Sequence, residues 1–420
     1  MEIPENWIPA FFRDIGVFYG GGTPSTLNSE YWNGQIQWTT SKRLSDAPYL
    51  DRGERTISDR ALRESSTTLI PAGNLLIGTR VGTGKIVVNR IDIAISQDLT
   101  GVAVDKSKYL PEFIAYQTRA QRLQECFQKQ KRGVTIQGIS RDDLKEFVLY
   151  IPPLPEQKKI ASILLKIQKA IEIQESIIER TRELKKSTLH HVFTYGLRGE
   201  KLKETEIGQM PESWDLRDLE YVLKLAQYGL SVRGLSNGQY PILRMNCQID
   251  GQVHLNDLQY VNLDNETFEK FKIEDGDILF NRTNSWELVG RTAIYHSKDA
   301  AVFASYLIRL KLDEAQINPD FVNFFFNMNS TQKRLKSLAS RGVSQSNISA
   351  SKLRTFQVPV PGLAEQLEIV RILRAIDQKI NLHTARKSAL QDLFKAMLNK
   401  LMTGEIRVKD LDIDVSEVSA

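Results

Sequence analysis

Two long segments that share one apolar pattern constrain this fold more than any other feature of the sequence. The first spans residues 152–193 and has no glycine or proline after Pro155. Pro155 and Glu156 suit a first helical turn, where proline fits the backbone and an acidic side chain meets the positive end of the helix dipole. Beyond them apolar residues recur every three or four positions, which is the spacing of a narrow helical stripe: Ile160, Ile163, Leu164, Ile167, Ala170, Ile171, Ile177, Ile178, Leu184, Leu189 and Val192. The segment predicts a helix of roughly 55 Å whose stripe must be buried against another helix.

The partner for that stripe lies in the same chain, in residues 361–403. Apolar residues recur there with the same spacing: Ile369, Ile372, Leu373, Ile376, Ile380, Leu390, Leu393, Met397, Leu398 and Leu401. An ungapped match over about forty residues predicts a tandem duplication. At an offset of 209, the matched positions include Gly133-Val134 with Gly342-Val343, Ile139-Ser140 with Ile348-Ser349, and Glu156-Gln157 with Glu365-Gln366.

The region before each long helix has the mixed pattern of an α+β globule. The two globules begin alike, with Pro4-Glu5-Asn6-Trp7 and Pro211-Glu212-Ser213-Trp214, and residues 196–210 between the halves have the composition of a linker. Short β-branched and aromatic runs predict strands at 85–96, 277–281, 291–296 and 302–312. One helix per half is expected, at 111–131 and 319–340, each introduced by a proline.

Composition places the chain in a broad class. Its 420 residues have room for about two or three domains. A net charge of +5 and a pI near 8.9 are compatible with a polyanionic partner. The two cysteines, Cys126 and Cys247, form no paired motif, which favours a reducing compartment and disfavours a thiolate metal site. Because we find no leader pattern and no apolar run of membrane length, we expect a cytoplasmic protein.

The common catalytic signatures are missing. The stretch from Gly78 to Lys85 lacks the spacing of a phosphate-binding loop, since Ile86 stands where serine or threonine is needed. No third glycine completes a dinucleotide fingerprint. The five histidines, His190, His191, His254, His296 and His383, show no metal-ligand spacing. We therefore expect a chain that is not an enzyme, with no catalytic residue, no metal site and no cofactor of its own.

Polar loops at matching places in the two globules carry the residue types that contact DNA. Arginine and lysine reach phosphates or guanine, and asparagine or glutamine reaches adenine. The loops of the two globules differ in amino-acid sequence, whereas the segments that flank them match. This is expected if each globule recognises a different DNA sequence. Solvated loops without a ligand are the alternative for any single position. The candidate DNA-binding residues are Lys42, Arg43, Arg80, Lys85, Arg132, Gln137, Arg244, Arg282, Asn284, Arg341, Gln345 and Asn347.

These features together resemble one known family. Two variable globules, each ending in a motif like Ile151-Pro152-Pro153-Leu154-Pro155-Glu156-Gln157 and a long helix, resemble the specificity subunit of type I restriction-modification systems. Gly22-Thr23-Pro24-Ser25 and the stretch from Gly133 to Ser140 are similar to recurring elements of that family. The second half departs from it, with Gly229-Leu230-Ser231 at the entry loop and Gly362-Leu363-Ala364 in the proline cluster.

The resemblance implies a fold and an assembly. The fold class is α+β: two tandem target recognition domains separated by two long antiparallel coiled-coil helices with pseudo-two-fold symmetry. Each domain would read half of a bipartite double-stranded DNA site, and the helices would set the spacing. Two methyltransferase subunits and the restriction subunits would dock on the chain, and S-adenosylmethionine, ATP and magnesium would bind only to those partners. The expected boundaries are 1–151 and 211–358 for the domains, 152–195 and 359–405 for the helices, 196–210 for the linker and 406–420 for a C-terminal tail.

Two other functions stay open at this stage. Scattered Asp, Glu and Lys residues are compatible with a nuclease of an unrecognised class, for which metal-dependent cleavage by the purified chain would be the evidence. A coiled-coil scaffold that binds proteins but no nucleic acid is the other alternative. Steep salt dependence of duplex binding would count against the scaffold.

Overall fold

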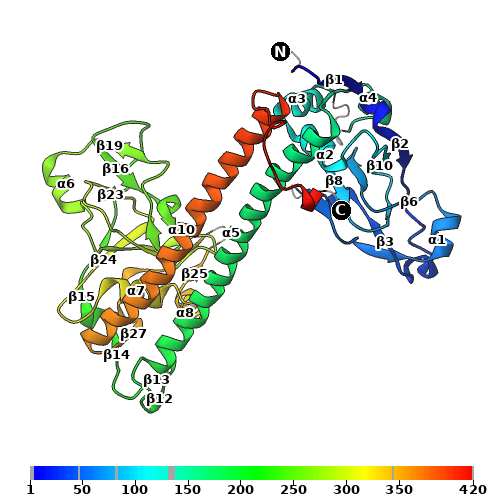
Figure 1. Ribbon diagram of the computed structural model, residues 1–420. Coiled ribbons are helices and arrows are strands. Elements are labelled where there is room, and N and C mark those ends of the chain that lie inside the picture. Colours follow the sequence, from blue (N-terminus) through cyan, green and yellow to red (C-terminus); the bar gives the residue numbers. More distant parts are fainter. Residues whose placement is uncertain (1–3, 46–47, 81–83, 131–137, 343–344, 419–420) are drawn as a thin grey trace. The chain divides into compact units, whose positions relative to one another are not determined.

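A computed structural model describes residues 4–45, 48–80, 84–130, 138–342 and 345–418 of the chain. The chain divides into two compact units. Unit 1 contains residues 1–176 and 383–420, and unit 2 contains residues 177–382. The chain passes from unit 1 to unit 2 within helix α5 (Leu154–Tyr195) and returns within α10 (Leu363–Met402) (Figure 1).

Unit 1 is built on two sheets. The larger has strand order β2-β10-β7-β8-β4 and the smaller has β5-β3-β9-β6. Strand β1 pairs with β11, so the start of the globule is joined to the strand that enters α5. The strands are β1 (Ile8–Phe11), β2 (Gly16–Gly20), β3 (Ile36–Thr39), β4 (Tyr49–Leu50), β5 (Arg55–Ile57), β6 (Thr68–Ile70), β7 (Asn74–Gly78), β8 (Ile86–Asn89), β9 (Ile93–Ile95), β10 (Leu99–Val104) and β11 (Val148–Ile151).

Strand β7 shows why these short apolar runs form a central sheet. All five of its residues are buried, and alternate side chains enter different cores. Leu75 and Ile77 pack with Phe113 of the helical layer, whereas Leu76 packs with Ile95 of the smaller sheet. A strand that is covered on both faces has a continuous apolar run, because successive side chains point to opposite faces.

The single helix expected in each globule is two helices. Residues 111–131 contain α2 (Pro111–Arg119) and α3 (Gln121–Gln130), and residues 319–340 contain α7 (Pro319–Phe326) and α8 (Asn329–Ser337). Ala120 and Met328 adopt extended backbone angles at the breaks. A glutamine of the second helix then binds a carbonyl freed at each break: Gln124 Nε2 donates to Thr118 O at 2.7 Å, and Gln332 Nε2 donates to Phe326 O at 2.7 Å.

The structure corrects one further expectation about local structure and adds detail in two other places. The run 85–96 holds two strands, β8 and β9, and 302–312 holds β23 and β24, because a turn interrupts each run. The expected linker contains a hairpin of β12 (Leu202–Thr205) and β13 (Gly208–Pro211). Short helices α4 (Arg141–Lys145) and α9 (Ala350–Arg354) follow the matched Ile-Ser pairs, since Ser140 and Ser349 accept hydrogen bonds as their N-caps.

Unit 2 repeats the plan of unit 1. Its larger sheet has order β15-β24-β20-β22-β18-β17, a three-stranded sheet has β19-β16-β23, and β14 pairs with β27. Helix α6 (Asn265–Phe271) occupies the place in chain order that α1 (Asp59–Glu64) has in unit 1. The strands are β14 (Asp215–Asp218), β15 (Leu223–Tyr228), β16 (Tyr240–Leu243), β17 (Gln248–Ile249), β18 (Gln252–Val253), β19 (Gln259–Val261), β20 (Ile278–Asn281), β21 (Thr283–Asn284), β22 (Thr292–Ile294), β23 (Val302–Phe303), β24 (Leu307–Leu312), β25 (Ser340–Arg341), β26 (Ser346–Asn347) and β27 (Gln357–Val360).

The long helices α5 and α10 pack against each other with antiparallel pairing. In unit 1, Lys387 Nζ lies 2.7 Å from Glu175 Oε1. In unit 2, Lys185 Nζ lies 2.6 Å from Asp377 Oδ1, so a step forward along α5 is a step backward along α10. The expected apolar stripe of α5 is buried in unit 1, where Ile160 and Leu164 belong to the core of the globule. The stripe of α10 is buried in the same way in unit 2, at Ile369 and Leu373.

The repeated Glu-Gln motif ties each long helix to its globule. Gln157 Oε1 accepts from Leu110 N at 2.8 Å, and Gln366 Oε1 accepts from Asn318 N at 2.7 Å. Both glutamine side chains are fully buried. Each amide group also donates to the proline-rich entry, at Pro152 O and Pro361 O. The motif therefore fixes the start of each long helix against the entry of α2 or α7.

The glutamate of the motif binds an arginine that follows the other long helix. Glu156 is bidentate with Arg407, at 2.9 and 3.0 Å. Glu365 Oε2 lies 3.4 Å from Arg198 Nε, and its Oε1 accepts from Leu197 N at 3.0 Å. The C-terminal segment also places Val408 and Val418 in the core of unit 1.

Candidate nucleic-acid interface

A small three-stranded sheet in unit 2 brings five of the candidate residues together. Its order is β21-β26-β25, with Asn284 opposite Ser346 and Arg341 opposite the same residue. Asn347 belongs to the central strand, and Arg282 immediately precedes β21. Gln345, in the turn before β26, is exposed. The sheet therefore joins two loops that are about sixty residues apart in sequence.

Arg282 is held in place by neighbours on three sides. Its Nη2 donates to Asn347 Oδ1 at 3.2 Å, and its Nη1 donates to Ser305 O at 3.4 Å. Its guanidinium lies 4.7 Å from the ring centre of Tyr228. A planar guanidinium that is fixed by such contacts loses little rotamer freedom when it binds a phosphate or a guanine edge.

The loop that carries Arg244 lies beside this sheet. Asn284 Nδ2 approaches Met245 Sδ at 3.1 Å, which joins β21 to the residue after Arg244. Arg244 Nη2 donates to Asp257 O at 3.2 Å and is half-buried. The six candidate residues of the second half thus belong to one sheet and its adjoining loops, although the structure describes only the backbone of Arg341.

In unit 1 the candidate loops meet around Asp98. Ser41 N donates to Asp98 Oδ2 at 2.9 Å, and Thr79 N donates to Asp98 O at 3.0 Å. Lys42 and Arg43 follow Ser41 in a short 3-10 turn (Ser41–Arg43) and are exposed. Of the other candidates in the first half, Arg80 and Lys85 are exposed. Arg132 and Gln137 lie outside the described residues.

Matched backbone bonds hold these loops in the two units. Ile139 N donates to Thr79 O at 2.8 Å, and Ile348 N donates to Arg282 O at 2.9 Å. Arg282 N donates to Tyr306 O at 3.0 Å, as Thr79 N does to Asp98 O. Thr79 is therefore the structural counterpart of Arg282. The same backbone frame presents a threonine in one unit and an arginine in the other.

Two aromatic residues at this surface were not predicted. Tyr228 is 43% exposed, and its ring lies against the Arg282 guanidinium. Tyr306 is 46% exposed, and its backbone carbonyl accepts a hydrogen bond from Arg282 N. Exposed aromatic rings can stack on bases or sugars, whereas the prediction considered only charged and amide side chains. Tyr228 directly precedes Gly229, at the entry loop where the second half departs from the family pattern.

Neither a metal-ligand cluster nor a membrane-spanning helix is found in the described part of the chain. Among the described residues, no three His, Cys, Asp or Glu side chains cluster closely enough to hold a metal ion. None of the described helices combines the length and apolar character that crossing a membrane requires.

Comparisons with known proteins agree with this architecture. The family described as "Type I restriction modification DNA specificity domain" matches residues 4–181 and 211–392. The MjaIX specificity subunit of Methanocaldococcus jannaschii is 23% identical over 98% of this chain and 96% of its own length. The EcoKI specificity subunit of Escherichia coli is 26% identical over 73% of this chain and 69% of its own length.

Similarity in structure extends over nearly the whole chain. The crystal structure of a type I restriction-modification S subunit from M. genitalium has a TM-score of 0.62 at 18% identity, covering 96% of this chain and 98% of that one. A structure from a study of type I complex assembly has a TM-score of 0.58 at 15% identity, covering 97% and 100%. Two matched domains, the repeated Glu-Gln motif and the paired long helices thus place this chain in the type I restriction-modification DNA specificity family.

Proposed function

We propose that this chain is the DNA-reading subunit of a type I restriction-modification complex. Each unit reads one half of a bipartite double-stranded target through its polar loops. Methyltransferase subunits and restriction subunits dock on the chain and bring S-adenosylmethionine, ATP and magnesium. The chain itself catalyses nothing and binds no cofactor.

One observation supports this proposal most directly. The two units hold their loops with the same backbone hydrogen bonds but present different side chains on them. The bonds from Ile139 N to Thr79 O and from Ile348 N to Arg282 O hold equivalent loops in the two units. Sequence readout needs donors and acceptors at fixed positions, and a rigid frame with variable side chains supplies them. Scaffold proteins have no need for loops that vary in this way.

The first experiment expresses the chain with a methyltransferase partner and maps methylated adenines by sequencing. A bipartite motif is the expected result. Exchange of residues 5–150 for the first domain of another family member should change one half of that motif only. A change in both halves would contradict independent reading by the two units.

A single substitution tests the interface of unit 2. Arg282→Ala should weaken binding by about 1–3 kcal/mol or relax the base choice at one position, as expected when a base or phosphate contact is lost. Arg354→Ala is the matched control, because Arg354 is another arginine of unit 2 and its exposed side chain pairs with Glu220. Equal effects of the two substitutions would argue for a general charge effect and against readout by Arg282.

The spacing role of the long helices has its own test. Insertion of seven residues near Gln174 and near His383 keeps each apolar stripe in phase. It lengthens each helix by about 10 Å, which corresponds to about three base pairs. An active variant with an unchanged spacer would show that the helices do not set the distance between half-sites.

A further inference from the structure

The first strand of the larger sheet ends at a residue that differs between the two units. Strand β2 ends at Gly20, which pairs with Thr100, the second residue of β10. Strand β15 ends at Tyr228, which pairs with Ile308, the second residue of β24. Gly20 and Tyr228 are therefore counterparts, and unit 1 lacks the side chain that unit 2 has at this place.

In unit 2 the Tyr228 side chain reaches from the end of β15 to the start of α9. Its Oη accepts a hydrogen bond from Ala350 N at 2.9 Å. Ala350 is the first residue of α9, directly after the N-cap Ser349. The Arg282 guanidinium lies over the same ring, 4.7 Å from its centre. Unit 2 thus holds a cation beside the place where β15 and α9 come together.

In unit 1 the same space is filled from the opposite side. Arg141 is the first residue of α4, directly after the N-cap Ser140, and it matches Ala350 at the offset of 209. A Cβ atom placed on Gly20 would lie only 2.8 Å from Arg141 Nη1 and 3.1 Å from Arg141 Cζ. The guanidinium therefore lies against the backbone of Gly20, where a side chain of that residue would otherwise stand.

Each unit supplies its cation from a different element. In unit 2 the cation is Arg282, which follows β20, and its counterpart in unit 1 is the uncharged Thr79. In unit 1 the cation is Arg141, and its counterpart in unit 2 is the uncharged Ala350. The two units differ at both positions, and yet each keeps one guanidinium in the same part of the frame. This indicates that the guanidinium itself is needed there.

No polar contact within the described chain accounts for Arg141. Its side chain is exposed, and no described residue forms a hydrogen bond, an ion pair or a ring contact with it. A cation in the first turn of a helix is also opposed by the positive end of the helix dipole, so α4 gains nothing from it. The N–H donors of this guanidinium are therefore available to a ligand.

Neighbouring charges favour a base over a phosphate as that ligand. Asp142 and Asp143 follow Arg141 in the same turn of α4. The Asp142 side chain is 93% exposed, and Lys145 pairs with it at 3.3 Å. Carboxylates repel a phosphate, whereas the major-groove edge of guanine is neutral. Guanine presents O6 and N7 there as a pair of acceptors that fits the fork of a guanidinium.

We propose that Arg141 reads a guanine in the half-site of unit 1, as the counterpart of Arg282 in unit 2. Its guanidinium donates to O6 and N7, and contact with Gly20 limits the rotamer freedom that binding would cost. This inference rests on the proposed DNA-reading function and adds a residue that lies outside the predicted polar loops. It requires a G·C pair in the half-site of unit 1.

The test uses the full chain expressed with its methyltransferase partner, and it maps methylated adenines by sequencing. The exchange of residues 5–150 shows which half of the motif belongs to unit 1. That half should contain a G·C pair, and Arg141→Ala should lower the discrimination at one such pair by about tenfold to a hundredfold. The other half should stay unchanged. A unit 1 half made only of A·T pairs, or a wild-type motif in Arg141→Ala, would overturn the proposal.

A second variant separates a guanine contact from a phosphate contact. Arg141→Lys keeps the charge but loses the planar fork, so it should relax the same position and keep the salt dependence of binding. A phosphate contact predicts that Arg141→Lys keeps the motif. It also predicts that Arg141→Ala weakens binding to all sequences alike and lowers the slope of log K against log salt by about one. That pair of results would overturn the assignment to guanine.

The matched control is Lys145→Ala, which removes a positive charge from the same short helix. It should leave the motif unchanged, and relaxation of the same base position in this variant would contradict the assignment to Arg141. If Arg141→Ala fails to fold, the lysine variant decides the matter. A wild-type complex without a bipartite motif would contradict the proposed function and this inference with it. A bipartite motif that both Arg141 variants retain would contradict this inference alone.

Discussion

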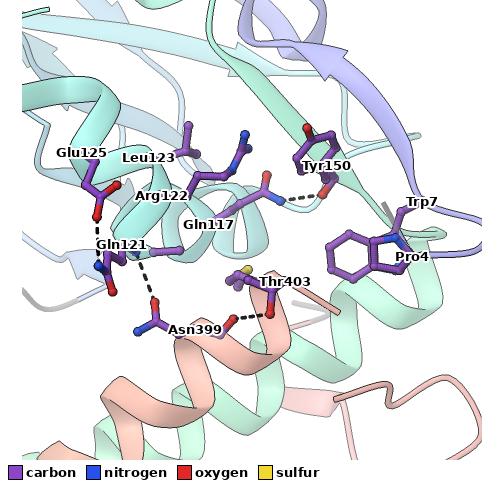
Figure 2. A pocket seen from close by; sticks show the side chains of 12 residues that line it. Pro4, Trp7, Gln117, Gln121, Arg122, Leu123, Glu125, Tyr150, Asn399 and Thr403 are labelled. Carbon is purple, nitrogen blue, oxygen red and sulfur yellow. Dashed lines mark hydrogen bonds between the residues drawn. The ribbon is translucent and has the colours of Figure 1, made fainter. Parts of the chain in front are cut away.

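The two ends of the long-helix pair differ although one sequence pattern was duplicated to make them. In unit 2, Phe193 at the end of α5 is packed among Trp214, Phe321 and Phe325. In unit 1, Met402 at the end of α10 borders a cavity instead. Figure 2 shows Trp7 and Tyr150 on one side of this cavity and Asn399 and Thr403 of the α10 end on another. The residues that make specific hydrogen bonds, Gln157 and Gln366, are the same in both units, whereas the residues that fill space have diverged.

This difference shows which part of the repeat tolerates change. A glutamine that satisfies three backbone groups has no substitute of similar shape, since its loss leaves several buried groups unpaired. A space-filling side chain can become smaller at a cost that neighbouring groups partly absorb. The aromatic pair of Trp7 with Phe113 keeps a ring distance of 6.4 Å, close to the 6.1 Å between Trp214 and Phe321, despite the changes beside it.

The largest loss of stability is expected when the two space-filling side chains, Phe193 and Met402, are truncated and compared. Phe193→Ala should destabilise unit 2 by about 3–5 kcal/mol, because it leaves a cavity inside a packed aromatic cluster. Met402→Ala should cost unit 1 only about 2 kcal/mol, since space is already present around that side chain. Amide hydrogen exchange in α7 and α2 measures the two units separately. Equal losses would mean that the cavity in unit 1 is effectively filled in solution.

The ion pairs at the long-helix starts give the next comparison. Arg407→Ala should cost about 3 kcal/mol, because Glu156, 3% exposed, loses a bidentate partner and stays buried. Arg198→Ala should cost less than about 1 kcal/mol, since Arg198 is 59% exposed and Glu365 keeps its bond from Leu197 N. Urea unfolding of the two variants checks the ranking. A larger loss for Arg198→Ala would reverse it.

A pH effect in the range where histidine titrates is expected in unit 2. The hydrogen bond to Asp320 raises the pKa of His296, against the effect of its burial, and Asp275 adds to the rise while the charge of Arg374 opposes it. The folded state therefore holds this proton more tightly than the unfolded chain. The stabilisation is fully present below the usual pKa of 6.5 and is lost as the pH rises through the raised value.

The expected size is about 1 kcal/mol, the usual net contribution of one hydrogen bond. His296→Gln should remove this pH dependence, measured as the unfolding midpoint of unit 2 on both sides of the titration. The counterpart position in unit 1 is Arg90, because Gly73 N donates to Asn89 O as Gly276 N donates to Tyr295 O one residue earlier. The Arg90 guanidinium keeps its charge over this range. Arg90→Gln should therefore leave the pH dependence of unit 2 unchanged, and an altered profile in that variant would contradict the assignment.

The smallest effects on stability are expected at exposed cations of the candidate interface. Lys42→Ala and Arg43→Ala should each change stability by less than about 0.5 kcal/mol, because both side chains are exposed. If they contact phosphates, each should lower the slope of log K against log salt by about one. Fluorescence anisotropy with duplex DNA at several salt concentrations measures that slope. An unchanged slope would favour the solvated-loop alternative for both residues.

Periodicity in the sequence was enough to predict the long helices. Apolar residues at three- and four-residue spacing, from Ile160 onward, indicate one buried face in any fold, so α5 and α10 were predictable. The breaks at Ala120 and Met328 were not, because no proline or glycine marks them. They depend on Gln124 and Gln332 folding back to bind freed carbonyls, which only the finished helix pairs allow.

The candidate interface was also predictable only in part from the sequence. Residue types alone identified Arg282, Asn284 and Asn347 as candidates. They did not predict that these residues meet at one small sheet, or that the Tyr228 ring lies against Arg282. Strand pairing between segments distant in sequence is set by tertiary packing, and a local pattern carries no record of it.

The duplication, the long helices and the repeated Glu-Gln motif could be predicted from the amino-acid sequence, because each is a local or internally repeated pattern. Folding was needed to show that Glu156 binds Arg407, that Thr79 and Arg282 are counterparts, and that Met402 and Gln117 border a cavity. Those facts join residues that are distant in the chain. Their energies come from packing and desolvation at the contact, which exist only when the two segments meet.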